Sequence, residues 1–253
     1  MVRRGLGRSG LEVSPIGFGA FKIGRNTGTN NAQRYELPGA GEVARLLDGI
    51  LDLGINYIDT APAYGLSEER LGRALAGRRG EVVISTKVGE TFKDGRSTYD
   101  FSAAAVRGSV QRSLKRLGRE VIDVLFVHSG GDDLAVSSGT DVVATLQDLR
   151  RKGVVRAIGL SARTVEGARA ALHWADALMV EYHLEDTSHA QVIGEAHAAC
   201  VGVVVKKGLA SGRLDPAKSI RFVLSTPGVC SMLIGSLSLE HLRADVAAAG
   251  AAR

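Results

Sequence analysis

The chain has 253 residues, of which 45% are hydrophobic and 23% are charged, and its formal net charge is +5. This composition is typical of a globular protein, and no segment approaches the roughly 18 uninterrupted apolar residues that a membrane span needs. The basic residues are scattered and only 5% of residues are aromatic, so a nucleic-acid-binding surface is not expected.

The N-terminal residues are basic but are followed by polar residues rather than by an apolar segment. No secretory signal is therefore expected, and the cytoplasm is the expected location. Residues 3–6 and 11–13 flank Arg8, Ser9 and Gly10, which predicts a short hairpin at the floor of the fold.

From residue 41 onward, helix-period segments alternate with short β-branched runs, as in parallel strands joined by crossover helices. The predicted strands are Ile16–Gly19, Ile55–Asp59, Val82–Lys87, Val121–His128, Ala157–Ser161, Leu178–Tyr182, Val201–Lys206 and Met232–Gly235. Eight such strands in about 250 residues predict an α/β fold, a (β/α)₈ TIM barrel with a short N-terminal β-hairpin, in which residues 1–253 form a single domain.

Helix starts are indicated by residues that favour the N-cap position, namely Ser67, Ser102, Thr164 and Ser238. Residues 43–53 place five apolar side chains on one face, as an outer helix of a barrel requires. Residues 24–41, rich in Asn, Gly and Thr, predict an irregular loop that is either a wall of the site or a tolerated insertion.

The two cysteines, Cys200 and Cys230, have neither metal-ligand spacing nor a disulfide pattern, and both are expected to be buried thiols.

Polar residues stand at the C-terminal ends of several predicted strands. In a barrel these ends meet at one mouth, where the fold assembles its active site. The residues are Asp59, Lys87, His128, Ser161, Glu181 and Lys206.

Tyr64 follows Asp59 by five positions in a tight loop. A phenol is a weak acid at neutral pH, but a neighbouring ammonium such as Lys87 eases the release of its proton, and a carboxylate such as Asp59 would hold that lysine. His128 would bind the oxygen of a carbonyl group or share its proton. These side chains together predict a proton-donating site.

These motifs resemble the aldo-keto reductase family over nearly the whole chain. The specific match is Asp59-Thr60-Ala61 followed by Tyr64-Gly65 and Ser67-Glu68, with Gly17-Phe18-Gly19, Gly159-Leu160-Ser161 and Ile234-Gly235-Ser236 on other strands. The resemblance implies an NAD(P)H-dependent enzyme that reduces aldehyde or ketone carbonyls to alcohols. It also implies catalytic roles: Tyr64 donates the proton, Lys87 lowers the pKa of Tyr64, Asp59 holds Lys87, and His128 orients the carbonyl.

The resemblance further implies that NADP(H), or alternatively NAD(H), lies across the barrel mouth. Lys206 replaces an aromatic residue that stacks on the nicotinamide in the family, and the family's basic residues for the 2′-phosphate are absent, which predicts a weak preference for NADPH over NADH. The implied cofactor-binding residues are Gly19, Ala20, Phe21, Asp59, Ser161, Glu181, Lys206, Gly208, Leu209, Ser211, Gly212, Gly235, Ser236, His241 and Asp245.

Only residues 213–220 separate the glycine-rich turn from the next predicted helix, and the chain stops soon after its last helix. Longer relatives fold both regions over the cofactor, so a more open site and modest cofactor affinity are expected.

Two alternatives remain open beside the enzyme. The same fold occurs as a non-catalytic nicotinamide-binding regulatory or interaction subunit, since a fold does not by itself set a function. A metal-dependent hydrolase or lyase would need clustered ligands, and His128, His183, His189 and His197 show no zinc-type spacing, so no metal site is expected.

The expected partner is a small-molecule carbonyl substrate, with no nucleic acid and no membrane, and protein partners stay unknown.

Overall fold

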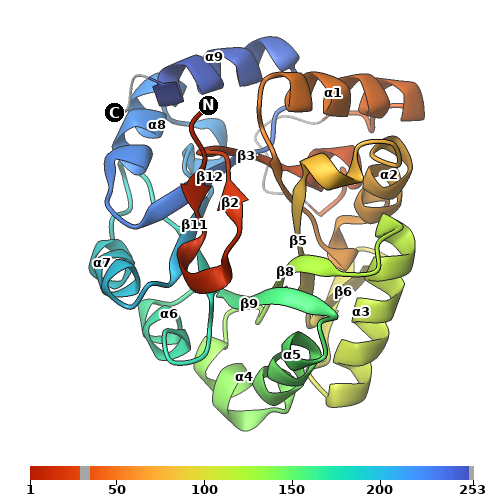
Figure 1. Cartoon of the computed structure of the whole chain (residues 1–253), viewed down its shortest axis with the longest axis vertical. Coiled ribbons are helices and arrows are strands. Elements are labelled where there is room, and N and C mark those ends of the chain that lie inside the picture. The colour runs from red at the N-terminus through yellow and green to blue at the C-terminus, as the bar shows by residue number, and fades with distance from the viewer. Residues whose placement is uncertain (29–34, 251–253) are drawn as a thin grey trace.

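Eight parallel strands close into a barrel in the computed structural model, which describes residues 1–28 and 35–250 (Figure 1). Around the ring the strands are β10 (Ala177–Glu181), β11 (Gly202–Lys206), β12 (Val229–Ile234), β3 (Ile16–Gly19), β4 (Tyr57–Asp59), β5 (Val83–Val88), β8 (Ile122–Val127) and β9 (Val155–Ser161). The eight predicted strands are confirmed, and the largest shift of a boundary is at the start of β12. The predicted TIM barrel is therefore confirmed.

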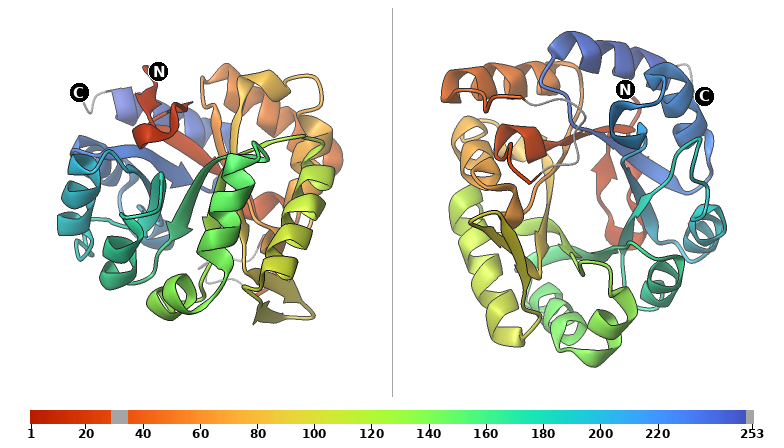
Figure 2. Two further views of the ribbon diagram at one scale, coloured as in Figure 1. Left: turned by 60° about the horizontal axis from the view of Figure 1, so that its bottom comes forward. Right: turned by 180° about the vertical axis from the view of Figure 1, so that it is seen from behind.

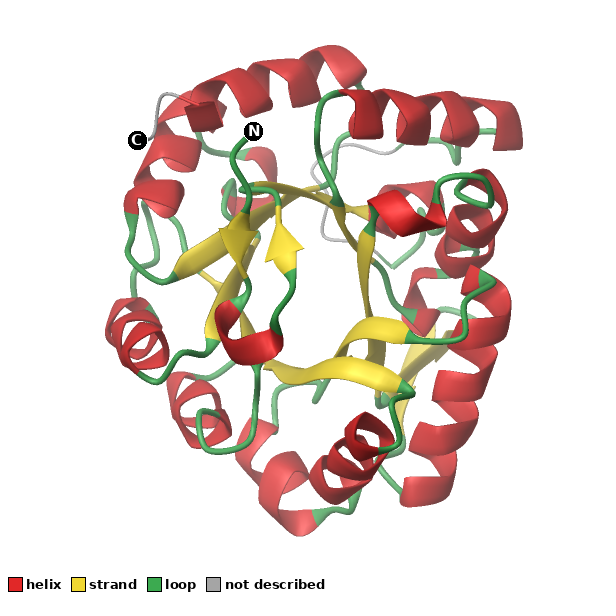
Figure 3. Cartoon of the chain, viewed as in Figure 1, coloured by secondary structure: helices red, strands yellow, loops and turns green. Residues whose placement is uncertain are grey.

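A ring of helices surrounds the strands (Figure 3). The helices are α1 (Ala40–Asp52), α2 (Ser67–Ala74), α3 (Ala103–Leu117), α4 (Asp133–Gly139), α5 (Val142–Arg151), α6 (Val165–Ala171), α7 (Ala190–Ala198), α8 (Pro216–Ser225) and α9 (Leu239–Gly250). The predicted apolar face of α1 packs on the barrel through Leu46, Leu47 and Ile50. Helix α1 begins inside the predicted loop 24–41, of which residues 29–34 lie outside the described part of the chain.

A second, smaller core lies inside the barrel and is closed by the N-terminal hairpin. Strands β1 (Arg4–Gly5) and β2 (Glu12–Val13) pair across one end of the barrel (Figure 1). The buried side chains of Leu6, Leu11 and Val13 join the inward-facing Tyr57 and Phe126 in one cluster. The hairpin predicted at the barrel floor is therefore confirmed.

A second hairpin, which the sequence analysis missed, follows β5. Strands β6 (Glu90–Lys93) and β7 (Arg96–Tyr99) pair around Asp94-Gly95, a dipeptide that favours two-residue hairpin turns. Seen from behind the view of Figure 1, this hairpin stands on the face opposite the N-terminal one (Figure 2). Gly89 joins it to β5 with a φ of +105°, and a Cβ there would lie 2.2 Å from the Phe101 ring. The connection therefore requires glycine.

The predicted helix caps are partly confirmed. The side chains of Ser102 and Thr164 accept backbone N–H groups at the starts of α3 and α6, and Ser238 does so at the start of α9. The prediction for Ser67 is wrong, because Ser67 is already inside α2 and its hydroxyl instead donates to the carbonyl of Ala20, 2.8 Å away. A long-range contact thus replaces the local cap.

Three further expectations can be compared with the structure. Cys230 is buried as expected, whereas Cys200 is exposed just beyond the end of α7, so the expectation for Cys200 is wrong. Helix α8 begins at Pro216, capped by Asp215, so the segment after the glycine-rich turn is shorter than predicted. Within the described residues, no helix has the length and apolarity to cross a membrane.

Candidate active site

A cavity of about 960 Å³ opens at the mouth where the barrel strands end. Its volume lies near the top of the range for small-molecule sites. The predicted site residues that line it are Gly19, Phe21, Asp59, Tyr64, Lys87, His128, Ser161, Glu181, Lys206, Leu209, Ser211, Gly212, Gly235, Ser236, His241 and Asp245.

Two of the predicted cofactor-binding residues do not line this cavity. The side chain of Ala20 is fully buried, and its carbonyl accepts the Ser67 hydroxyl. Gly208 is buried against the side chain of Met232. Both residues support the wall of the cavity from behind.

A buried ion pair joins the ends of β4 and β5. Lys87 Nζ donates to Asp59 Oδ1 at 2.8 Å and Oδ2 at 2.6 Å, and to the carbonyl of Thr60 at 2.9 Å. Ser85 donates to Asp59 Oδ1 at 2.7 Å, and Tyr57 donates to Ser85 at 2.9 Å, so the carboxylate is held from inside the barrel. Burial alone would lower the pKa of Lys87, but Asp59 and Tyr64 outweigh it and hold this pKa above its ordinary value.

Tyr64 ends a short 3₁₀ turn, Pro62–Tyr64, that follows β4. Lys87 Nζ lies 4.7 Å from the centroid of the Tyr64 ring, and the Phe21 ring meets it edge-on at a centroid distance of 5.0 Å. Burial raises the pKa of the Tyr64 phenol, and Lys87 offsets this only in part, so the pKa stays above its ordinary value. Lys87 does act in the predicted direction, but burial has the larger effect.

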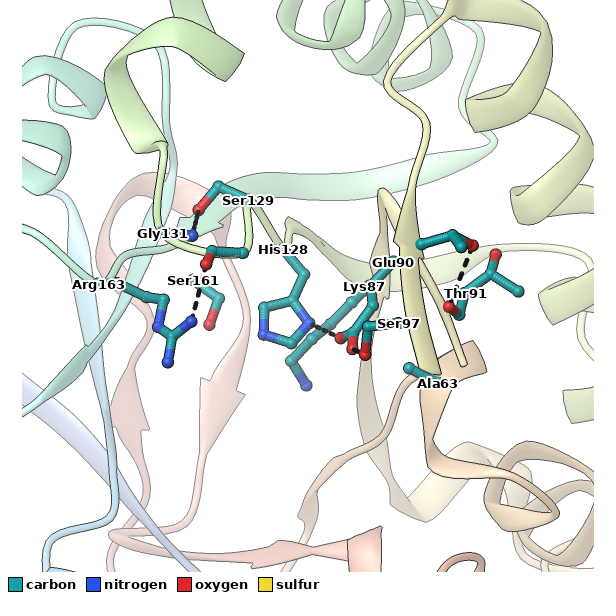
Figure 4. Close-up of polar contacts among 12 residues, drawn as sticks. Ala63, Lys87, Glu90, Thr91, Ser97, His128, Ser129, Gly131, Ser161 and Arg163 are labelled. Carbon is teal, nitrogen blue, oxygen red and sulfur yellow. Dashed lines mark hydrogen bonds and ion pairs between the residues drawn. The ribbon is translucent and has the colours of Figure 1, made fainter. Parts of the chain in front are cut away.

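His128 follows β8 and faces a carboxylate from the second hairpin (Figure 4). His128 Nδ1 lies 2.6 Å from Glu90 Oε2, which is an ion-pair distance. Burial lowers the pKa of His128, Glu90 raises it, and Lys87 and Lys206 lower it again; the net pKa is below the ordinary value. The pKa of Glu90 is lowered to about 2: burial raises it, but the hydrogen bond and charge of His128 and the hydroxyl of Ser97 outweigh that effect.

Glu90 was not among the predicted site residues, because the hairpin that carries it was not predicted. The other oxygen of Glu90 accepts the Ser97 hydroxyl from β7 at 2.5 Å (Figure 4). Arg25 holds the hairpin from the opposite side, because its guanidinium lies 3.1 Å from the centroid of the Phe92 ring and donates to the carbonyl of Ala63 at 3.0 Å. The Asp94-Gly95 turn is the local signal that would have found this element.

Two lysines contact Ser161 and Glu181, which are among the implied cofactor-binding residues. Lys206 Nζ donates to Ser161 Oγ at 3.0 Å and to the carbonyl of Ala162 at 2.8 Å. Lys207 is exposed and forms an ion pair of 2.6 Å with Glu181. Lys206 is therefore hydrogen-bonded, and Lys207 ion-paired, to residues at the ends of other strands.

The glycine-rich turn after β11 adopts an irregular backbone. Lys207, Ala210 and Ser211 all have positive φ values, between 47° and 61°. The N–H of Gly212, one of the implied cofactor-binding residues, donates to the carbonyl of Leu209 at 2.8 Å. A Cβ at Gly212 would meet no atom within 4 Å, so the cavity is open in front of this turn.

The far end of the cavity is formed by the start of α9. Ser238 Oγ accepts the N–H of His241 at 3.3 Å, and Ser236 Oγ accepts the N–H of Ser238 at 3.2 Å. Two N–H groups at this helix start are therefore already satisfied. Burial raises the pKa of Asp245, and His241 offsets this only in part.

The structure brings together three potential metal-ligating side chains that the sequence did not indicate as a cluster. One ligand atom from each of Glu181, His183 and Asp186 lies within 4.8 Å of the others. Lys207 already pairs with Glu181, and His183 Nδ1 accepts the N–H of Glu185 at 3.2 Å. These contacts account for two of the three side chains, and the absence of a metal site stays an expectation.

Comparison with known proteins gives consistent similarities. The model of the aldo/keto reductase family matches residues 15–219. A solved structure of a putative aldo-keto reductase from Pseudomonas aeruginosa is 46% identical, with a TM-score of 0.92, over 99% of this chain and 94% of that one. The uncharacterized oxidoreductase YqkF of Bacillus subtilis is 27% identical over 100% of this chain and 92% of its own length. The D-threo-aldose 1-dehydrogenase of a Pseudomonas species is 30% identical over 84% of this chain and 71% of its own length.

Proposed function

The chain belongs to the aldo/keto reductase family, and from this premise we propose that it reduces aldehyde or ketone carbonyls to alcohols with NADP(H) or NAD(H), with Tyr64 as the proton donor. Oxidoreductases that act on small carbonyl compounds are typical of the family, and relatives of this chain carry oxidoreductase names. The single observation that carries the proposal is the contact of Lys87 with both the Asp59 carboxylate and the face of the Tyr64 ring.

This arrangement suits proton donation at neutral pH. Because burial keeps the pKa of Tyr64 above its ordinary value, the phenol retains its proton until a strongly basic oxygen forms beside it. Lys87 stays charged because its own pKa is raised, and its charge stabilises the phenolate left behind. Asp59 holds the ammonium in place and balances its charge in the cavity wall.

His128 lines the same cavity and is fixed by Glu90. A proton on Nδ1 leaves Nε2 of the neutral ring as the atom that can contact a substrate oxygen. We propose that His128 orients the carbonyl group and that Glu90 sets the tautomer of His128.

The cavity is large enough for a dinucleotide, and it is open in front of Gly212. When bound, the nicotinamide would supply the hydride. The residues proposed to hold it are those of the cavity wall from β9 to α9, with Ser161 and Lys206 at one end and His241 and Asp245 at the other. The Lys206 amine would share the Ser161 hydroxyl with a bound carboxamide.

The test of this proposal is Tyr64→Phe, which removes only the phenolic hydroxyl. We expect kcat for the reduction of a good aldehyde substrate to fall by about 10²- to 10⁴-fold, the usual contribution of a general acid. The dissociation constant of NADPH, measured by fluorescence titration, should stay close to that of the wild type, because the ring and its packing on Phe21 remain.

Phe21→Leu is a matched control, since it loosens the packing of Tyr64 but keeps the hydroxyl, and it should reduce kcat far less. If Tyr64→Phe retained most of its turnover, Tyr64 would not be the proton donor. If the wild type bound NADPH but oxidised it with no aldehyde, ketone or quinone of a broad panel, the proposed enzymatic function would be wrong.

A further inference from the structure

Lys206 differs from the other lysine of the cavity, Lys87, in its partners. Lys87 pairs with both oxygens of Asp59. Lys206 forms no ion pair with any carboxylate in the part of the chain that the structure describes, and the nearby Glu181 is taken by Lys207. One cavity thus holds a charge-paired lysine and a lysine without a counter-ion.

The hydrogen bonds of Lys206 use two of the three positions on its nitrogen. A neutral amine has two N–H donors and one lone pair, whereas an ammonium has three donors. Lys206 Nζ donates to two acceptors, Ser161 Oγ and the carbonyl of Ala162. Both donors of the neutral form are therefore used, and the lone pair is left for another atom.

The charges around Lys206 also favour the neutral form. Burial and the ammonium groups of Lys87 and Lys207 lower the pKa of Lys206 to about 7, and the carboxylates of Asp133 and Glu181 offset this only in part. The charged or titratable groups that face it are Lys87, Lys207, Asp133, Glu181, His128 and His189. A desolvated lysine beside another cation is an activated nucleophile.

We propose that Lys206 is a second reactive group of this cavity, an amine that condenses reversibly with small aliphatic aldehydes to form a Schiff base. The nitrogen lone pair attacks the carbonyl carbon and a C–N bond forms. The carbonyl oxygen then leaves as water with the two protons of the amine, and a C=N bond remains. The step involves no oxidation or reduction and needs no nicotinamide.

The test traps the Schiff base in the full-length protein without nicotinamide. Propanal and cyanoborohydride are added at neutral pH, and the sites of propyl addition are identified by peptide mass spectrometry. Lys206 is expected to be labelled at least tenfold faster than the exposed Lys115. A lysine of ordinary pKa is neutral in only about one molecule in a few thousand at pH 7, whereas the lowered pKa of Lys206 gives it a far larger neutral fraction.

Because Lys206 and Lys115 are exposed to the same reagents, the ratio of their labelling rates reports the relative reactivity of the two amines. This ratio should fall as the pH rises well above 7, because Lys206 gains no further neutral form while an ordinary lysine continues to do so. Lys206→Arg keeps a cationic donor but cannot condense, and it should lose the fast labelling, whereas Lys207→Arg should retain it.

Labelling of Lys206 no faster than Lys115, fast labelling of Lys87 instead, or unchanged fast labelling of Lys206→Arg would each overturn the proposal. Peptide mapping of the wild type compares the labelling of Lys206 and Lys115 directly, so the proposal can be tested even if a variant does not fold. Tyr64→Phe should be labelled like the wild type, so this result and the test of carbonyl reduction are independent.

Discussion

Glu90 sets the electrostatics of the histidine in the cavity. Glu90→Gln removes the charge that raises the pKa of His128, while burial, Lys87 and Lys206 continue to lower it. We therefore expect the pKa of His128 to fall further below its ordinary value, as measured by NMR titration of the imidazole. We also expect kcat for carbonyl reduction to fall about 10- to 100-fold, by analogy with the outer partners of metal-ligating histidines.

Glu120→Gln is the matched control, because Glu120 is an exposed carboxylate before β8, at the opposite end of that strand from His128. Glu120→Gln should change neither the pKa of His128 nor kcat for carbonyl reduction. An unchanged pKa of His128 in Glu90→Gln would show that the 2.6 Å contact is not maintained in solution.

We expect the start of α9 to govern the preference between NADPH and NADH. Among the described residues, no Lys or Arg lines this end of the cavity. The N–H groups of Ser238 and His241 are already hydrogen-bonded, and the buried Asp245 lines the same cavity. A charge-assisted hydrogen bond to phosphate contributes about 1.5 to 3 kcal/mol, so its absence should weaken the preference for NADPH by about one to two powers of ten. NADPH is expected to bind with only a weak preference over NADH.

His241→Arg places a guanidinium at this end and should tighten NADPH binding about 10- to 100-fold while leaving NADH nearly unchanged, as measured by fluorescence titration of both. NADH serves as the internal control because it lacks the 2′-phosphate. A wild-type preference for NADPH above about a thousandfold would contradict the prediction, since it requires a basic contact worth about 4 kcal/mol.

The stability of the whole molecule depends on closure of the barrel floor. Leu6, fully buried, carries the N-terminal hairpin into the inner core beside Tyr57 and Phe126. Leu6→Ala should lower the free energy of unfolding by about 2 to 5 kcal/mol, because it leaves a cavity at a close-packed site. Urea unfolding followed by circular dichroism measures this loss.

Leu134→Ala is the control, since Leu134 is 47% exposed on α4 and its truncation should change stability by less than about 0.5 kcal/mol. Below its unfolding range, Leu6→Ala should keep the kcat of the wild type, because the floor and the cavity lie at opposite ends of the barrel. A loss of less than about 1 kcal/mol would mean that the hairpin does not seal the inner core.

Local patterns were sufficient to predict the barrel and the positions of its charged strand ends. Strand and helix periods are properties of neighbouring residues, so the eight strands could be found without tertiary information. Parallel strands in a closed barrel end at the same mouth, which is why Asp59, Lys87 and His128 could be predicted to meet. The Asp94-Gly95 turn was an equally local signal, and Glu90 was missed because that signal was not used.

The state of each charged group depended on contacts between distant residues. Ser67 has the sequence of a helix cap, yet its hydroxyl bonds to Ala20, which only the folded chain brings near. Tyr64 keeps a raised pKa because burial outweighs Lys87, and burial is a property of the whole structure. Lys206 has no ion pair within residues 1–28 and 35–250, whereas Lys207 pairs with Glu181 at the end of the neighbouring strand. The order of residues along the chain therefore indicates which side chains meet at the mouth. Which of them form ion pairs follows from the folded structure, because electrostatic pairing depends on distance and desolvation.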